Sequence, residues 1–183
     1  SIFWRSGSGR LATSSLIEIT ASLTASTSPE ANALLTASTA DVKGGTLVVG
    51  GDGRYGNRRA IDVILRMGAA HGLSKVIITT GGILSTPAAS NLIRHRQAIG
   101  GIILSASHNP GGENGDFGVK VNGANGGPTP ASFTDAVFEC TKTLEQYAIV
   151  EAAAIPLDEP GVHSIGAMQV EVIDGVDDFV ALM

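Results

Sequence analysis

The sequence predicts an α/β domain in three layers, with helices on both faces of a small mixed sheet. Short apolar, β-branched runs at 46–50, 75–79 and 101–104 are typical of buried strands. Segments with helical spacing lie between these runs, and alternating strands and helices favour parallel strands joined by right-handed crossovers. The loops that follow the three strands should therefore share one rim, where α/β proteins place their functional groups.

The N-terminal residues 1–45 carry the least regular pattern. Within 11–45, 19 of the 35 residues are Ala, Ser or Thr, and few large apolar side chains are present to build a core. Helices are expected around 16–23 and from Ser28 onward, where Pro29 suits a first helical turn. We treat 1–45 as a separate, divergent segment.

The middle of the chain predicts two helices from spacing and capping. Within 58–70, apolar residues recur at the spacing of one helical face. Ser85 followed by Pro87 predicts the start of a second helix, which should run to about Ile99 with Leu92 facing inward.

The C-terminal part predicts two more strands and two more helices. The segment 117–122 alternates like an exposed strand, and Phe138 is expected on the buried face of the following helix. In chain order the elements are a strand at 117–122, a turn at 123–130, a helix at 132–144, a strand at 170–174 and a helix from 177. That last helix is cut off after about two turns, so we expect the chain to be part of a longer protein.

Composition excludes several classes of protein. A net charge of −5 with 43% apolar residues excludes a disordered, highly charged chain. The single Cys140 excludes an internal disulfide and a cysteine-based zinc site. Because no apolar run approaches the ~20 residues of a membrane span and no signal peptide is visible, we expect no membrane association and a cytoplasmic setting.

Charge is distributed unevenly along the chain. Residues 51–107 carry a net charge of +5 and residues 108–183 a net charge of −10, with no Asp or Glu between 63 and 112. An acid-free basic stretch suits a small anion such as phosphate, although most of these arginines are explained as well by exposed helix faces. The charges are too few and too scattered for nucleic-acid binding.

The segment 51–56 (GDGRYG) matches the spacing of the dinucleotide-binding fingerprint. That fingerprint also needs an acidic residue about 20 residues further on, and none lies between 63 and 112. We therefore interpret the segment as a tight turn whose backbone amides can receive a phosphate, and keep a nicotinamide-binding domain as a third hypothesis.

The segment 105–112 (SASHNPGG) is the most informative, because it begins where the third predicted strand ends. An exposed Ser107 hydroxyl there could act as a nucleophile, and His108 beside it supplies an imidazole, the side chain that serves as a general acid or base around neutral pH. Asn109 and Pro110 force a rigid turn with available backbone amides. From the residues alone, a phosphate-handling or nucleophile loop is only slightly favoured over an ordinary turn.

The same segment resembles the phosphoserine loop of the α-D-phosphohexomutase family. Further segments resemble that family in the same order, and the last is similar to its phosphoglucomutase branch. They are 49–55 (VGGDGRY), 82–87 (GILSTP), 115–120 (GDFGVK) and 125–128 (NGGP). The resemblance covers roughly residues 46–183.

The resemblance implies one domain of a normally four-domain enzyme, with 46–174 as domain I and 175–183 as the start of the connection to a second domain. The phosphoglucomutase branch interconverts glucose 1-phosphate and glucose 6-phosphate through a phosphoserine and a glucose 1,6-bisphosphate intermediate. Sugar phosphates are the implied partners, monomer and dimer stay open, and these 183 residues should be inactive alone.

The resemblance also implies roles for individual residues. By its position in the motif, Ser107 would carry the transferable phosphate, and Mg²⁺ would bind through that phosphate. His108 and Lys120 would transfer protons or stabilise charge. Arg54 and Asn109 would bind phosphate or shape the loop.

Two departures from the family leave an alternative open. The family's N-terminal phosphate loop reads Thr-Ser-Gly-Leu-Arg, whereas 5–10 reads RSGSGR, so Arg10 is the candidate for that arginine. The Asp-Gly-Asp-Gly-Asp loop that supplies magnesium ligands does not occur in this sequence. The alternative is a catalytically silent scaffold or binding protein, which the retained Ser107, His108 and Lys120 argue against.

Overall fold

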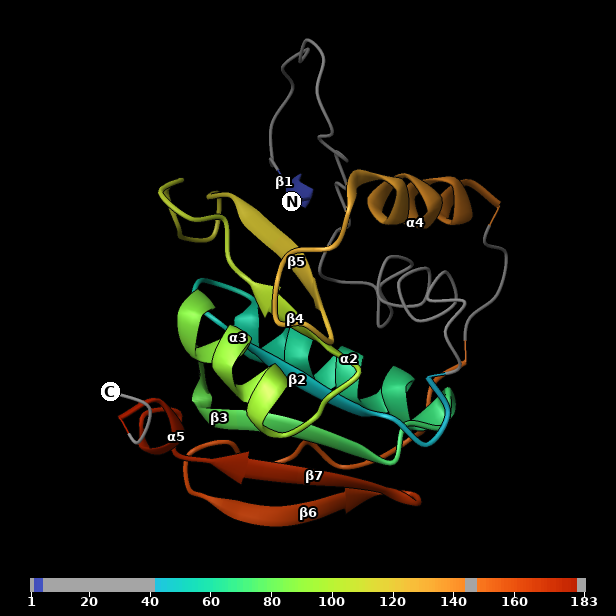
Figure 1. Cartoon of the computed structure of the whole chain (residues 1–183), viewed down its shortest axis with the longest axis vertical. Coiled ribbons are helices and arrows are strands. Elements are labelled where there is room, and N and C mark those ends of the chain that lie inside the picture. Colours follow the sequence, from blue (N-terminus) through green and yellow to red (C-terminus); the bar gives the residue numbers. More distant parts are fainter. Residues whose placement is uncertain (1, 5–41, 144–147, 181–183) are drawn as a thin grey trace, which may run out of the picture.

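The computed structural model describes residues 2–4, 42–143 and 148–180. Within these residues a seven-stranded mixed sheet runs in the order β1-β5-β4-β2-β3-β7-β6 (Figure 1). The strands are β1 (Ile2–Trp4), β2 (Thr46–Gly51), β3 (Lys75–Ile83), β4 (Gly100–Leu104), β5 (Phe117–Gly123), β6 (Gly161–Ile165) and β7 (Met168–Ile173). The central strands β4, β2, β3 and β7 are parallel, whereas β5 and β6 run antiparallel to their neighbours.

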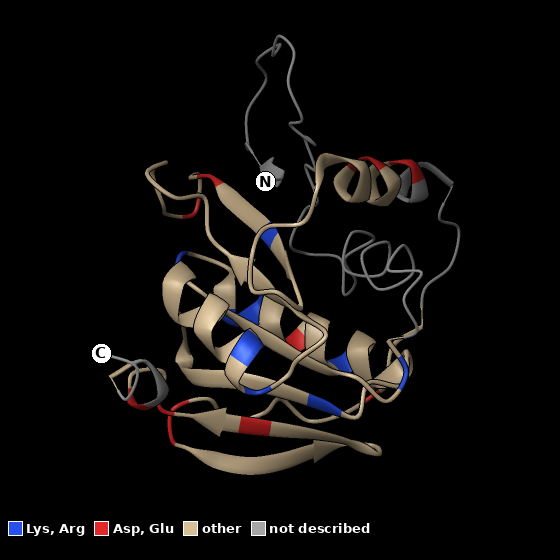
Figure 2. Cartoon of the chain, viewed as in Figure 1, with Lys and Arg blue, Asp and Glu red and all other residues tan. Residues whose placement is uncertain are grey.

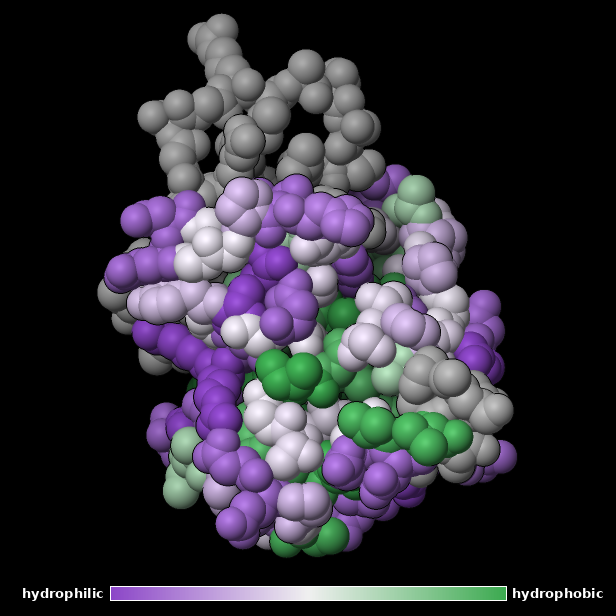
Figure 3. Space-filling view, turned by 90° about the vertical axis from the view of Figure 1, so that its left-hand side faces the viewer, coloured by the Kyte–Doolittle hydropathy of each residue, from purple (hydrophilic) through white to green (hydrophobic). Residues whose placement is uncertain are grey.

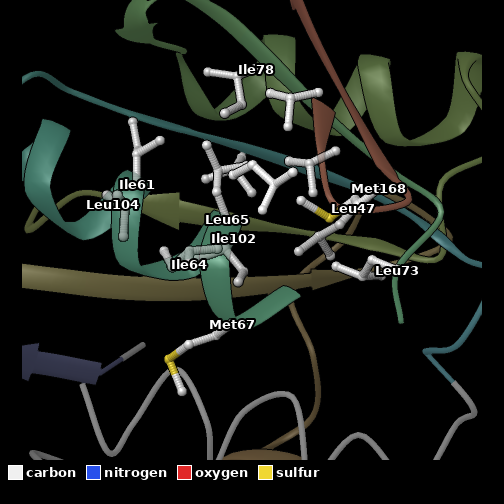
Figure 4. Close-up of a cluster of buried hydrophobic side chains, with 14 of the residues drawn as sticks. Leu47, Ile61, Ile64, Leu65, Met67, Leu73, Ile78, Ile102, Leu104 and Met168 are labelled. Atoms are coloured by element: carbon white, nitrogen blue, oxygen red, sulfur yellow. The ribbon is translucent and has the colours of Figure 1, made fainter. Parts of the chain in front are cut away.

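Helices cover both faces of this sheet, which confirms the three-layer α/β/α architecture. They are α2 (Asn57–Ala70), α3 (Thr86–His95), α4 (Ala131–Thr143) and the short α5 (Asp177–Val180). Side chains of α2 meet those of β2, β3 and β4 in one apolar cluster (Figure 4). Helix α4 adds Val137 to this cluster. A second cluster lies under α3, on the opposite face.

Strand β2 shows how the sequence builds both clusters at once. Successive strand residues point to opposite faces, so Leu47 and Val49 belong to the α2 cluster and Val48 to the α3 cluster. A parallel strand that is buried on both faces reads as a continuous apolar run. This is why the central strands were predictable from apolar runs without alternation.

The helix predicted to reach Ile99 ends at His95, which corrects its C-terminal boundary. The chain reverses after α3, because Gln97 has a φ of 51° and the amide of Ala98 donates to the carbonyl of Ile93 (2.9 Å). The amide of Ile99 then donates to the carbonyl of Thr46 (2.9 Å), so Ile99 already leads into the sheet.

The C-terminal predictions need three corrections. Strand β5 is not an exposed strand, because each of its residues is buried or partly buried. It also pairs with β4 on one side and β1 on the other. Phe138 is 38% exposed, whereas the neighbouring Val137 is buried. Strand β6 was not predicted, since its residues alternate between partly buried and exposed and only Ile165 is fully buried.

Several predictions lie outside the described residues. The helices expected around 16–23 and after Ser28 fall there, and the domain boundaries at 45 and 174 stay predictions. None of the described helices is both long and apolar enough to cross a membrane.

A buried valine on β7 and an exposed valine on β6 allow a matched test of this core. Val170 is fully buried and Val162 is 64% exposed. Val170→Ala removes two buried methyl groups and should lower the free energy of unfolding by about 2 kcal/mol. Val162→Ala should change it by no more than about 0.5 kcal/mol. Urea denaturation of the two variants measures the difference, and equal losses would contradict the assigned core.

Candidate active site

The loops after β2, β3 and β4 meet at one rim of the sheet, as predicted. The amide of Asp52 donates to the carbonyl of Leu104 (3.1 Å), and the amide of Leu84 donates to the carbonyl of Gly51 (2.8 Å). Figure 3 faces the side on which the parallel strands end, where hydrophilic residues surround a smaller hydrophobic area. The exposed apolar side chains near this rim include Ile83 and Val176.

Ser107 lies in the turn directly after β4, with its side chain exposed. Its φ is 56°, a left-handed conformation that is uncommon for a residue other than glycine. Such a conformation costs about 1–3 kcal/mol and persists where the surroundings hold it. The amide of Ser107 donates to the Ser105 hydroxyl oxygen (3.1 Å), and the amide of Asn109 donates to the carbonyl of Ala106 (3.1 Å).

Lys120 is brought to this turn by the pairing of β5 with β4. Its Cα lies opposite that of Ile103, one residue before β4 ends. From there the Lys120 Nζ donates a hydrogen bond of 2.6 Å to the Ser107 Oγ. An ammonium group so close to a hydroxyl can offset negative charge on that oxygen or exchange a proton with it.

Arg54 links two loops at the rim. Its Nε (2.9 Å) and Nη2 (2.6 Å) donate to the carboxylate of Asp52, and its Nη1 donates to the carbonyl of Asp116, just before β5. Its side chain is only 7% exposed. Arg54 therefore holds the loop after β2 against the start of β5, and its phosphate-binding role stays a prediction.

The remaining predicted site residues are His108, Asn109 and Arg10. His108 and Asn109 follow Ser107 in the turn, and both are exposed. Arg10 lies outside the described residues. The structure thus brings together Ser107 and Lys120, with His108 and Asn109 next to Ser107 in the turn, while Arg54 bonds the carbonyl just before β5.

Sequence reasoning missed Asp52, Ser105 and Gly118. The Asp52 carboxylate accepts hydrogen bonds from Arg54 and from the Ser105 hydroxyl. A Cβ on Gly118 would lie 2.4 Å from the carbonyl oxygen of Ser105, so β5 needs glycine to approach the turn this closely. A signal for Ser105 did exist, since serine side chains commonly bond the backbone amide two residues further on.

The charges around the site come from different parts of the fold. Figure 2 shows Lys and Arg mainly on the central elements, and Asp and Glu mainly on α4, around β6 and β7 and in the loop that leads to β5. The acid-free stretch 63–112 ends five residues after Ser107, and Glu113 and Asp116 follow in the loop that leads to β5.

The Asp52 carboxyl has a lowered pKa. Partial burial raises it, but the hydrogen bonds from Arg54 and Ser105 and the positive charge of Arg54 outweigh that effect. The pKa therefore lies below its ordinary value of 3.8, and Asp52 is ionised at neutral pH.

The described residues do not by themselves fit a complete metal site. Among them, no group of three or more His, Cys, Asp or Glu side chains is placed to hold a metal ion. A phosphate on Ser107 would offer one oxygen ligand. A magnesium ion at this turn would need its remaining ligands from elsewhere.

Comparison with known proteins supports an assignment to a family. Residues 13–148 match the model of the phosphoglucomutase/phosphomannomutase alpha/beta/alpha domain I. The chain belongs to this family, as the resemblance in the sequence predicted, and the match is to its first domain.

Several proteins similar to this chain are phosphoglucomutases. The phosphoglucomutase of Rhizobium radiobacter is 54% identical over 141 residues, which cover 77% of this chain and 26% of that protein. Phosphoglucomutase 1 of Drosophila melanogaster is 47% identical over 155 residues, covering 82% of this chain and 28% of that protein. The open form of pp63/parafusin, a phosphoglucomutase from Paramecium, superposes with a TM-score of 0.79 at 38% identity, covering 84% of this chain and 30% of that one. The chain thus spans about a quarter of the length of its curated relatives.

The anchoring of Asp52 predicts how its carboxyl titrates. Its pKa, measured by NMR, should lie below 3.8 and should rise in Arg54→Gln, because the variant removes the charge and the paired hydrogen bonds. The stabilisation from this lowered pKa is complete above about pH 3.8 and is lost as the pH falls through the folded-state pKa.

Arg94→Gln is the matched control, because the Arg94 guanidinium bonds Ser90 on α3 and not Asp52. It should leave the pKa of Asp52 unchanged. An Asp52 pKa that does not move in Arg54→Gln would contradict the described anchoring.

Proposed function

We propose that this chain is the phosphoserine-bearing domain of a phosphoglucomutase, which interconverts glucose 1-phosphate and glucose 6-phosphate. The observation that carries the proposal is the 2.6 Å hydrogen bond from Lys120 to Ser107, on a turn that exposes the serine at the rim of the sheet. Similarity to phosphoglucomutases across the same residues supports it.

Ser107 serves in this proposal as the phosphoryl carrier. A hydroxyl of the sugar monophosphate attacks the phosphorus of phosphorylated Ser107, the bond to the Ser107 Oγ breaks, and glucose 1,6-bisphosphate forms. The bisphosphate then returns its other phosphoryl group to the Ser107 Oγ, which leaves the isomeric monophosphate. Covalent catalysis of this kind divides one difficult transfer into two easier ones.

Lys120 serves as the proton donor to the Ser107 Oγ. As the bond between that oxygen and phosphorus breaks, the Lys120 ammonium, already hydrogen-bonded to the oxygen, neutralises its growing charge and passes it a proton. In the return transfer the proton goes back to Lys120 as the new bond forms. His108, next in the turn, is proposed as the group that accepts the proton of the attacking sugar hydroxyl and gives it to the departing sugar oxygen in the return transfer.

Magnesium binding and sugar recognition need groups outside the described residues. Magnesium, bound in part through the Ser107 phosphate, would offset negative charge on the transferring phosphoryl group. The other metal ligands and the groups that recognise the sugar would come from the rest of a longer protein, since the relatives are about four times the length matched. The cytoplasmic setting, the oligomeric state and the role of Arg10 stay predictions.

A silent scaffold is the less favoured alternative. Ser107 holds a left-handed conformation that is costly for serine, and a lysine is bonded to its hydroxyl. A scaffold gains nothing from this arrangement, whereas a phosphoryl carrier needs an exposed, charge-stabilised hydroxyl.

A coupled assay for glucose 6-phosphate tests the proposal in the full-length protein that carries this chain. It starts from glucose 1-phosphate with magnesium and a trace of glucose 1,6-bisphosphate. Ser107→Ala removes the carrier oxygen and should lower kcat by about 1000-fold or more. Lys120→Met should lower it by about 100-fold or more, because it removes the proton donor.

Ser164→Ala is the matched control for the serine substitution, since Ser164 is an exposed serine on β6, the strand at the opposite edge of the sheet from β1 and β5. It should retain wild-type activity. A folded wild-type protein without mutase activity, or an active Ser107→Ala variant, would overturn the proposal in favour of the scaffold.

A further inference from the structure

We propose that Ser105, held by Asp52, is a positioning residue that fixes Ser107 in the conformation from which it reacts. The proposal rests on the proposed function for the chemistry that Ser107 performs. Ser105 bonds the Ser107 amide and Asp52 bonds Ser105, so both act through the backbone of the turn and not on the reacting oxygen itself.

The Ser105 hydroxyl is hydrogen-bonded to the backbone amide of Ser107. Ser105 is the last residue before the turn, and its side chain is almost fully buried against the rim. Its Oγ accepts the Ser107 amide hydrogen at 3.1 Å. Because Ser107 occupies a left-handed conformation that is disfavoured for serine, something must hold its backbone, and this bond acts at the residue itself.

The Ser105 hydroxyl also has a fixed orientation. A serine hydroxyl has one hydrogen to donate, and it can rotate. At Ser105 that hydrogen goes to the Asp52 carboxylate, which leaves the oxygen lone pairs to face the Ser107 amide. Asp52 is in turn held by hydrogen bonds from the Nε and Nη2 of Arg54. The Ser105 hydroxyl therefore accepts the hydrogen bond from the Ser107 amide. The buried Arg54 side chain fixes the Asp52 carboxylate that orients this hydroxyl.

The pair formed by Asp52 and Arg54 is also linked to Lys120, through β5. Arg54 also bonds the carbonyl of Asp116, immediately before β5. Gly118 in β5 passes so close to the Ser105 backbone that no Cβ fits between them. Strand β5 carries Lys120 two residues later. One anchor, Asp52 with Arg54, thus sets the position of both partners in the Ser107–Lys120 hydrogen bond.

A pair of substitutions at Ser105 separates positioning from simple stabilisation. Ser105→Ala removes the hydroxyl, whereas Ser105→Thr keeps it. In the full-length protein, Ser105→Ala should lower kcat by about 10- to 100-fold, because small misplacements of a reacting group cost rate on this scale. The KM for glucose 1-phosphate should not change, and Ser105→Thr should restore most of kcat. Ser164→Ala, on β6, is the control for loss of a serine hydroxyl elsewhere.

A second measurement follows the Ser107 backbone without relying on activity. With serine labelled by nitrogen-15, NMR reports the amide–water exchange rate of Ser107 and its intraresidue amide-to-Hα contact, which is short at positive φ. Exchange should be faster and the short contact weaker in Ser105→Ala and in Asp52→Asn, and near wild type in Ser105→Thr.

The outcomes distinguish this proposal from the proposed function. A wild-type protein without mutase activity refutes the proposed function, and the NMR comparison alone then decides whether Ser105 positions Ser107. An unchanged kcat in Ser105→Ala, a loss confined to KM, an equal loss in Ser105→Thr, or an unchanged Ser107 backbone signal in Ser105→Ala overturns the positioning role.

Discussion

The antiparallel pairing of β5 with β4 is the constraint on which the candidate site depends. It sets Lys120 opposite Ile103, so that the Lys120 ammonium reaches the Ser107 hydroxyl in the turn that follows β4. The close passage of Gly118 along the backbone of Ser105 makes this pairing possible right up to the turn. Without that register, the serine and the lysine would be separate surface residues with no shared chemistry.

The rest of the fold holds this pairing in place. Parallel strands β2, β3 and β4 are buried between α2 and α3, so the rim from which the turn projects is rigid. Arg54, itself nearly buried, then ties the loop after β2 to the start of β5. A strained, exposed serine is thus supported from a packed core through two loops, which is how many enzymes place reactive groups on rigid elements.

The sequence made the buried layers predictable, but only part of the site. Continuous apolar, β-branched runs such as 46–50 are typical of strands buried on both faces. The residues of the motif 105–110 are contiguous, so they can be recognised from the sequence alone. Strand β6 and the exposure of Phe138 depend on which tertiary neighbour covers each side chain, and the spacing of apolar residues in the sequence carries no information on that. The role of Asp52 was hidden for a similar reason, because its partner Ser105 is 53 residues away and meets it only after β4 is laid beside β2.

Ser107 is proposed to carry a phosphoryl group, and locating the phosphate by tandem mass spectrometry is the decisive measurement. The full-length protein, incubated with glucose 1,6-bisphosphate and magnesium and then digested, should carry one phosphate on Ser107, in the turn beside Lys120. A folded protein that stays unmodified at Ser107, or that carries the phosphate on another residue, would contradict the account.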